Sequence, residues 1–291
     1  MKHKSLVIYL ILLSVLCAGL VIGVKRLGEQ GNYLAGLYMF TPAIAALLTR
    51  SFFYEPHFKD ANLRLGRIAD YVRFWLLAVG IMALSFALYT PMGAITWDFS
   101  GSVFLGRLAQ QFATTGQDMT ASLPSGFTPQ MMLIIFFVGG LTVFNIIPGI
   151  LSGLGEEFGH RSFMFPLLYR INPWAGLVGG GLIWFGWHLP LTLIIPQTAA
   201  SPLWQTGLNF LMMGIGSIFT FIYLAYVYVK SKSVFVTSIA HIAMNNASQS
   251  FSYFVVVQNQ LLANLGTVLA NDHCRRCPLR YKGIGHIRQV L

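Results

Sequence analysis

Long apolar runs without charged residues divide this chain and restrict its possible folds more than any other feature. The first run is SLVIYLILLSVLCAGLVIGV, at residues 5–24. Further runs cover residues 33–49, 74–97, 131–153, 174–198 and 206–229, and the stretch 234–270 contains no Asp, Glu, Lys or Arg. Because each helical residue adds about 1.5 Å, about twenty apolar residues are enough to cross a bilayer. The runs predict an all-α polytopic membrane protein.

The composition supports this class. Hydrophobic residues make up 55% of the chain and charged residues only 10%, whereas about a quarter of the residues in a soluble domain are charged. The stretch 234–270 is too long for one crossing and about right for two. We therefore expect about eight transmembrane helices.

The positions of the cations predict the orientation, because cytoplasmic segments of membrane proteins are enriched in Lys and Arg. With a cytoplasmic amino terminus, the outside segments keep only Lys25, Arg26 and Arg107. The inside segments then hold the basic tail and Lys2, Lys4, Arg50, Lys59, Arg64, Arg67, Arg73, Arg161, Arg170, Lys230 and Lys232. The net charge of +10 is thus a topology signal, and we expect no nucleic-acid partner.

One alternative topology stays open at this point. If the segment EEFGHRSFMFPLLYR, residues 156–170, crossed the membrane by itself, Lys230 and Lys232 would move to the outside. We favour a helix that ends or bends near the cytoplasmic face, because that arrangement keeps these two cations inside.

The same pass along the chain divides it into three parts. Residues 1–130 hold amino-terminal transmembrane helices and a polar external loop at 98–130, with an amphipathic turn around 104–112. Residues 131–270 form the core, and residues 271–291 form a basic tail. Cys274 and Cys277 with His273 and His286 offer a zinc site in the tail, but C-x-x-C without a second pair is a weak signal. A disordered basic tail is the favoured interpretation.

Ionisable side chains in the core need a reason, since each costs from about 2.5 kcal/mol at the centre of a bilayer. Three groups stand out: Glu156, Glu157, His160 and Arg161; His188; and His241 with Asn245 and Asn246. Taken singly, His188 fits a packing histidine, Asn245 an interhelical hydrogen bond and His160 a residue at the membrane interface. Their joint occurrence is what favours a site.

Helical spacing indicates how these groups meet. Glu157 and Arg161 are four residues apart with the acid first, which favours an ion pair and leaves Glu156 about 100° away around the helix. His241 and Asn245 share a face, and His241 lies about 12 Å beyond Ser233 at 1.5 Å per residue. A carboxylate, two imidazoles and an amide at one depth predict a buried hydrolytic site without a Ser or Cys nucleophile, in which a partly desolvated carboxylate serves as general base.

Three motifs carry a family resemblance. EEFGHR at 156–161 matches Glu-Glu-x-x-x-Arg, WFGWH at 184–188 is similar to Phe-x-x-x-His with Trp184 in place of Phe, and HIAMN at 241–245 matches His-x-x-x-Asn. In this order they resemble the CAAX-protease and bacteriocin-processing family of intramembrane endopeptidases, which includes type II CAAX prenyl endopeptidases. The resemblance covers roughly residues 131–250.

The resemblance implies hydrolysis of a peptide bond in a membrane-associated, prenylated or leader-type peptide, in a bacterial plasma membrane with lipids as neighbours. Glu156 would be the general base, with His188 holding the water. His241 and Asn245 would stabilise the oxyanion, and Glu157 with Arg161 would order the helix. Glu156, His188 and His241 would be the ligands if zinc were bound; no H-E-x-x-H spacing is present, and both a metal-free and a zinc mechanism stay open.

Two functions of other classes compete with the peptidase. A transporter would use the same buried charges as a proton relay, but transporters of the repeat type have two similar halves and the sequence shows no internal repeat. A non-catalytic immunity or scaffold protein of the same fold, as in self-protection against bacteriocins, remains the alternative.

Overall fold

Helices dominate the computed structural model, and the fold class predicted from the sequence is confirmed. The model describes residues 2–28, 36–114, 125–147, 149–193, 203–259 and 262. Within these residues four helices are long and apolar enough to cross a membrane: His3–Leu27, Gly36–Phe53, Ile68–Tyr89 and Leu203–Ser231. The basic tail, with its two cysteines and two histidines, lies outside the described residues.

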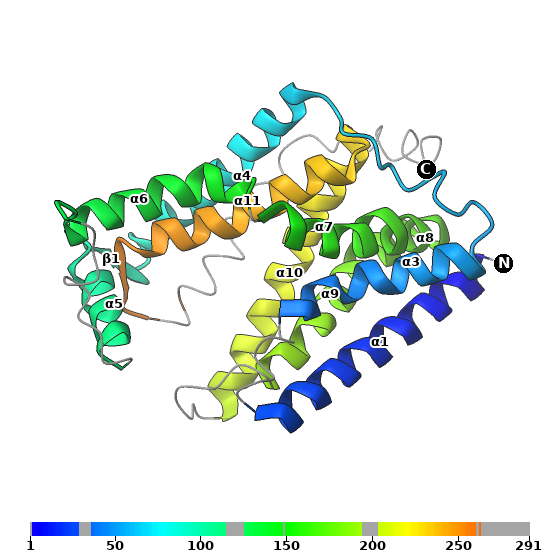
Figure 1. The fold of residues 1–291 in the computed structure, drawn as a ribbon, viewed down its shortest axis with the longest axis horizontal. Helices are drawn as coiled ribbons and strands as arrows, with labels where there is room; N and C mark the ends of the chain where they lie inside the picture. Colours follow the sequence, from blue (N-terminus) through cyan, green and yellow to red (C-terminus); the bar gives the residue numbers. More distant parts are fainter. Residues whose placement is uncertain are drawn as a thin grey trace.

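The amino-terminal helices form one side of the molecule (Figure 1). Helix α1 (Lys2–Leu27) lies beside α3 (Thr41–Phe53), which follows the 3-10 turn η2 (Gly36–Phe40). The two helices run antiparallel, because the Ser5 hydroxyl near the start of α1 donates to the Phe53 carbonyl at the end of α3, at 2.6 Å. The helices predicted from the first two apolar runs are therefore present as an antiparallel pair.

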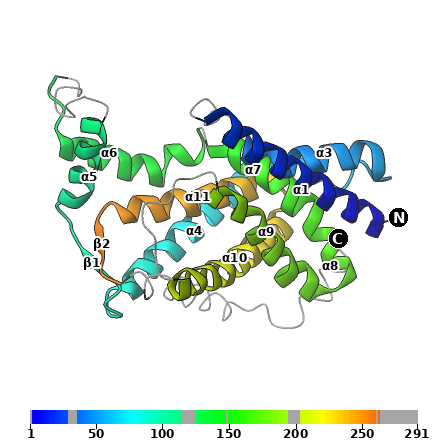
Figure 2. The ribbon, with the colours of Figure 1, turned by 90° about the horizontal axis from the view of Figure 1, so that it is seen from below.

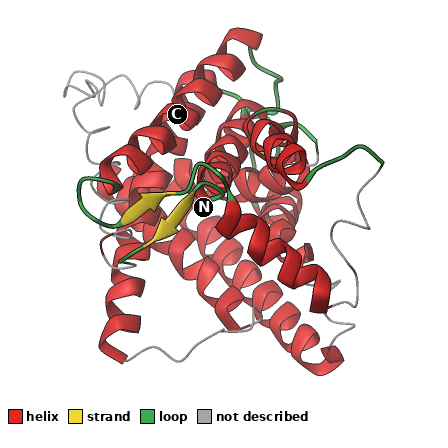
Figure 3. Cartoon of the chain, turned by 90° about the vertical axis from the view of Figure 1, so that its left-hand side faces the viewer, coloured by secondary structure: helices red, strands yellow, loops and turns green. Residues whose placement is uncertain are grey.

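Helices α4 (Ile68–Tyr89) and α11 (Val234–Ser252) make the most extensive helix contact in the fold (Figure 2). The Ser233 hydroxyl caps α11 by accepting from the Val236 amide, which satisfies one free donor of the first turn. At the far end, β1 (Ile95–Trp97) pairs antiparallel with β2 (Val255–Val257), with Ile95 opposite Val257 (Figure 3). Both helices thus run from one end of the molecule to this pair of strands.

The prediction that residues 234–270 cross twice is wrong. Helix α11 ends at Ser252, and the chain turns into β2 at Val255. Backbone pairing with β1 occupies residues 255–257, which a second crossing would need. The amphipathic segment predicted around 104–112 is confirmed and longer, as helix α5 (Ser102–Thr114).

The segment that carries the two glutamates is one continuous helical path with a change of pitch. Helix α6 (Pro129–Leu141) and the turn η3 (Val143–Asn145) precede it. It then comprises α7 (Gly149–Gly159), the π-helix η4 (His160–Met164) and α8 (Phe165–Ile171). A Cβ at Gly149 would meet Ile242 of α11, whereas the Ser162 hydroxyl bonds to the Ala61 carbonyl at 2.7 Å. The path thus starts beside the middle of α11 and runs toward the loop after α3.

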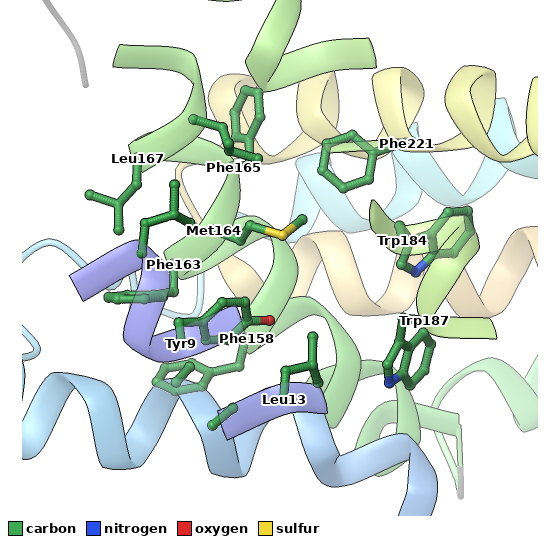
Figure 4. Packing of buried hydrophobic residues seen from close by; sticks show 14 of the residues in the cluster. Tyr9, Leu13, Phe158, Phe163, Met164, Phe165, Leu167, Trp184, Trp187 and Phe221 are labelled. Atoms are coloured by element: carbon green, nitrogen blue, oxygen red, sulfur yellow. The ribbon is translucent and has the colours of Figure 1, made fainter. Parts of the chain in front are cut away.

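Two helices complete the core. The π-helix η5 (Ala175–Gly179), α9 (Gly180–His188) and η6 (Leu189–Leu193) lead toward α10 (Leu203–Ser231). Large apolar side chains from α1, α7, η4, α8, α9 and α10 meet in one cluster (Figure 4). Phe158, Trp184 and Trp187 of this cluster come from the two helices that carry the first two motifs.

The loop 54–67 and the turn at 232–233 lie at the same end of the molecule. The Val234 amide donates to the Asn62 carbonyl at 3.1 Å, and Arg64 Nε donates to the Lys232 carbonyl at 2.6 Å. These bonds are incompatible with the alternative topology, because a protein cannot hold Lys59 and Lys232 on opposite sides of a bilayer while their neighbours touch.

Arg50 stabilises this end of the fold from inside. Its guanidinium, 1% exposed, pairs with Asp60 at 2.7 Å and donates to the Ser162 carbonyl of the π-helix at 2.7 Å. Tyr54 donates to the other oxygen of Asp60 at 2.5 Å, and burial, with this hydrogen bond, raises the pKa of Tyr54 to about 12. Arg50, which the sequence indicated only as a topology signal, thus joins the loop 54–67 to the helical path that carries Glu156 and Glu157.

The contacts at this end predict the topology. Reporter fusions at Lys59 and Lys232 should both read cytoplasmic, because hydrogen bonds join their segments, and a fusion at Ser100, beyond β1, should read external. Opposite readings at Lys59 and Lys232 would contradict the arrangement.

Candidate active site

Close approach of helices brings the two glutamates into the core. A Cβ at Gly155 would lie 2.8 Å from the Phe40 ring, and a Cβ at Gly159 would lie 2.4 Å from Pro42. Any larger side chain at these positions would push α7 away from α3. The glycines therefore let α7 pack tightly against α3, and Glu156 and Glu157 are 1% and 0% exposed.

Glu157 is the centre of a buried polar network. Its Oε1 accepts from Arg161 Nη1 at 2.9 Å and from His241 Nδ1 at 2.7 Å. The Arg161 guanidinium also lies over the rings of Phe221 and Trp184, at 4.3 and 4.8 Å from their centroids. The predicted ion pair is present, and it links α7 to α11 through His241.

Glu156 faces the second set of polar atoms. Its Oε1 accepts from Trp184 Nε1 at 2.5 Å, and it lies 4.0 Å from His188 Nε2 and 3.9 Å from His241 Nε2. These last two distances are too long for direct hydrogen bonds. They suit a water molecule that bridges the carboxylate and the two imidazoles.

Hydrogen bonds on the far side of each imidazole determine which nitrogen faces Glu156. His188 Nδ1 bonds to the Trp184 carbonyl at 2.9 Å, and His241 Nδ1 bonds to Glu157. A carbonyl and an ionised carboxylate only accept, so both Nδ1 atoms carry a proton. Each Nε2 is then left to interact with whatever lies beside Glu156.

Aromatic rings enclose His188 on two sides. The rings of Trp187 and Trp184 lie 4.5 and 4.7 Å from the imidazole, both edge to face. His188 keeps a 31% exposed side chain, whereas the His241 side chain is 3% exposed. The site therefore opens at His188 and is closed behind His241.

The structure brings together five of the six residues singled out for the site: Glu156, Glu157, Arg161, His188 and His241. Asn245 is exposed, one helical turn beyond His241 on the same face of α11. Its role in the site stays a prediction.

Sequence reasoning missed two residues near the site. The sequence indicated Trp184 only as an aromatic residue in place of Phe, but its indole N–H donates to Glu156. His160, predicted at the membrane interface, is fully buried and packs edge to face on Trp187 at 5.2 Å. A π-helix starts at His160, and π-helical turns occur often at functional sites.

A metal ion would find two overlapping sets of ligands here. Glu156, Glu157 and His241 place potential ligand atoms within 4.8 Å of one another, whereas the sequence pointed to Glu156, His188 and His241. Glu157 Oε1 already accepts from Arg161 and His241, and the nearby guanidinium repels a cation. A carboxylate with two imidazoles suits zinc, but tetrahedral ligands at about 2.1 Å lie about 3.4 Å apart, which is less than the 3.9 and 4.0 Å between these atoms.

The buried network predicts a stability defect. Glu157→Gln should lower the free energy of unfolding by about 3 kcal/mol, because it leaves Arg161 buried without its counter-charge. Arg161→Met in the same chain should restore part of the loss in thermal stability. Asp70→Asn is the control, since its partner Arg67 is 79% exposed and such pairs contribute at most about 1 kcal/mol. A double variant no more stable than Glu157→Gln would contradict the ion-pair role.

Comparison with known proteins addresses the family. No curated protein matches the chain. Residues 138–247 match the family model described as type II CAAX prenyl endopeptidase Rce1-like, and this segment includes all six residues singled out from the three motifs. Over residues 138–247 the chain is therefore similar to the Rce1-like family of type II CAAX prenyl endopeptidases.

Proposed function

We propose that this protein is an intramembrane endopeptidase in which Glu156 activates water to hydrolyse a peptide bond of a membrane-associated substrate. The observation that carries the proposal is the distance of about 4 Å from Glu156 Oε1 to the Nε2 atoms of both His188 and His241. One water in that space would have a carboxylate to accept its proton and two imidazoles to orient it. The Rce1-like family supports the same reaction class.

The reaction proceeds in two steps in this proposal. Glu156 takes a proton from the water as its oxygen attacks the carbonyl carbon of the substrate, and the carbonyl oxygen becomes an oxyanion. Glu156 then gives the proton to the amide nitrogen as the carbon–nitrogen bond breaks, which yields a carboxylic acid and an amine. The Trp184 indole holds the carboxylate in place through its bond at 2.5 Å.

His241 is the proposed electrostatic partner of the oxyanion. Glu157 accepts from its Nδ1 and thereby stabilises a doubly protonated ring, in the manner of the buried acid of a catalytic triad. Nε2–H of that ring can donate to the oxyanion. Asn245 lies on the same face of α11 and is exposed, so its amide is accessible to a bound substrate.

Glu156 is a better candidate for the base than Glu157. Glu157 Oε1 already holds Arg161 and His241, and a proton taken up by this carboxylate would weaken both interactions. We favour the metal-free mechanism, because the Glu156–imidazole spacing is wide for zinc and an arginine lies nearby. If zinc binds, Glu156, His188 and His241 would hold it, and the ion would polarise the water.

The proposed substrate is lipidated or otherwise anchored in the membrane. A groove of about 470 Å³ lies between α1 and the α9–η6 segment, and Trp187, which contacts His188, is part of its wall. Apolar side chains of α1 such as Leu10, Leu13 and Val21 line the other wall. A prenyl or acyl chain in this groove would place the attached peptide beside the site. The second hollow, about 250 Å³ between α5 and the end of α11, contains no acid or imidazole.

The proposed orientation puts the amino terminus in the cytoplasm of a bacterial cell. The amino terminus, the loop 54–67 and the turn at 232–233 lie at one end, and cations cluster there. The glutamate path runs toward this same end.

Replacement of the proposed base tests the reaction. Glu156→Gln should insert and fold normally but reduce cleavage of membrane-bound peptides at least about a hundred-fold, since it removes the general base. His241→Ala should reduce kcat by about 10² to 10³ with little change in KM, as for loss of an oxyanion donor. Peptidase assays in detergent or vesicles check both. Activity retained in both variants would make the constellation structural and favour the non-catalytic immunity or scaffold function.

A chelator separates the two mechanisms in the same assay. The wild-type enzyme should keep its activity after treatment with a chelator. Activity lost to the chelator and restored only by zinc would show that Glu156, His188 and His241 act as ligands.

The groove predicts an effect on substrate binding alone. A Cβ at Gly186 meets nothing within 4 Å, so Gly186→Leu should fill the groove without strain and raise KM for a lipidated peptide about ten-fold or more. Cleavage of the same peptide without its lipid should be unchanged. Gly19→Leu, equally unobstructed but not part of the groove wall, is the matched control. Equal effects of the two variants, or none, would argue against lipid binding there.

A further inference from the structure

Buried polar atoms without a hydrogen-bond partner are concentrated behind the candidate active site. Among the described residues eight such side-chain atoms occur, and six of them belong to Tyr9, Glu157, His160 and Arg161. Each of these four side chains is 0% exposed. Proteins pair buried polar groups almost without exception, with protein atoms or with ordered water, so this concentration calls for a common partner.

Three of the four residues occupy one face of the helical path. Glu157, His160 and Arg161 are at positions i, i+3 and i+4, where side chains are neighbours. Their unpaired atoms are Glu157 Oε2, both ring nitrogens of His160, and Nε and Nη2 of Arg161. The set contains an acceptor, two donors and a ring that can do either, which is the mixture that a water molecule can bridge.

Tyr9 reaches the same region from α1. Its ring packs on Phe163, with centroids 5.2 Å apart, and its hydroxyl points toward the interior of the apolar cluster (Figure 4). Tyr9 interacts electrostatically with Arg161 and Glu156, and His160 interacts with Arg161, His188 and His241. The contact of Tyr9 with Phe163 and these electrostatic interactions thus put the four unpaired groups in one part of the core, which is closed to solvent.

We propose that ordered water lies in this part of the core, where Tyr9, His160, Glu157 and Arg161 bind it. An internal water makes about three hydrogen bonds to otherwise unpaired groups, and these four side chains supply them. Through this water Tyr9 and His160 would hold the second oxygen of Glu157, whose first oxygen holds His241. Tyr9 and His160 are thus positioning residues for the imidazole beside Glu156.

Helix α1 thus contributes a positioning residue to the site from outside the segment that matches the family model. Tyr9 lies outside residues 138–247, and His160 occupies a variable position of the Glu-Glu-x-x-x-Arg motif. The water site is therefore a property of this chain's own residues.

Radiolytic labelling tests the water directly in the intact protein. Millisecond X-ray pulses convert bound water to hydroxyl radicals, which oxidise adjacent side chains even where bulk solvent has no access. We expect oxidation of Tyr9 and Met164. Met244 is the control, because it is comparably buried, 4% against 0% exposed, but packs in an apolar cluster. Oxidation of Tyr9 and Met164 no greater than that of Met244 would overturn the proposal.

Replacement of the Tyr9 hydroxyl gives a second, independent test. Tyr9→Phe keeps the ring against Phe163 and should lower Tm, because the water loses a partner; a hydroxyl buried dry and unpaired would instead make the same change neutral or stabilising. Tyr9→Phe combined with His160→Phe, which retains an aromatic contact with Trp187, should also abolish labelling of Met164. Tyr226→Phe, on a ring that packs on Phe74, is the control. An unchanged or raised Tm in Tyr9→Phe would overturn the proposal.

The kinetic consequence rests on the proposed function. Tyr9→Phe should reduce kcat about ten-fold with KM unchanged, since His241 is less well held. Labelling and Tm as expected in a protein without peptidase activity would leave the water site standing and remove only the proposed reaction. An unchanged kcat in an active enzyme would overturn the positioning role of Tyr9.

Discussion

The buried carboxylate of Glu157 is the interaction on which the rest of the site depends. One oxygen holds a cation from its own helix and an imidazole from α11. A buried ion pair is costly to desolvate and gives little net stability, but removal of one partner is severe. The bond from His241 thus fixes α11 relative to α7, because a movement between the two helices would break a hydrogen bond to a buried carboxylate.

Glycine makes this arrangement possible. Backbone atoms of α7 approach α3 and α11 so closely that a methyl group at Gly149, Gly153 or Gly159 would overlap with a neighbour. Small residues at interfaces let helices pack closely in membranes, where the hydrophobic effect no longer drives them together. Close packing here also excludes solvent from Glu157 and leaves the site open only beside His188. The same contacts therefore provide both the rigidity and the low polarity around the two carboxylates, as the proposed general base requires.

Most of the polar residues of the candidate site could be predicted from the sequence, but fewer of the contacts among them could. The pair Glu157 and Arg161 followed from helical spacing, and Glu156, His188 and His241 from the cost of polar groups in an apolar chain. Trp184 as a donor to Glu156 could not be predicted, because the bond joins residues 28 positions apart and depends on the packing of α9 against α10. His160 was misplaced because its burial depends on packing between separate helices, in which its ring lies against Trp187. The prediction of two crossings in 234–270 was wrong for a similar reason. Hydropathy does not distinguish a second helix from apolar residues that pair with a strand far away in the sequence.

The segment that matches the family model and the amino-terminal helices contribute different parts of the candidate site. Residues 138–247 supply every acid and imidazole around Glu156, yet the site would be incomplete without the first two helices. Thr41 of α3 accepts from the Trp187 indole at 3.0 Å, and Tyr38 donates to the Trp187 carbonyl at 2.7 Å. Trp187 in turn forms one wall of the apolar groove and one side of the enclosure around His188. A change in η2 or α3 that moves Trp187 would therefore alter the groove and the surroundings of His188 together, whereas the bonds from Arg161 and His241 to Glu157 do not involve Trp187.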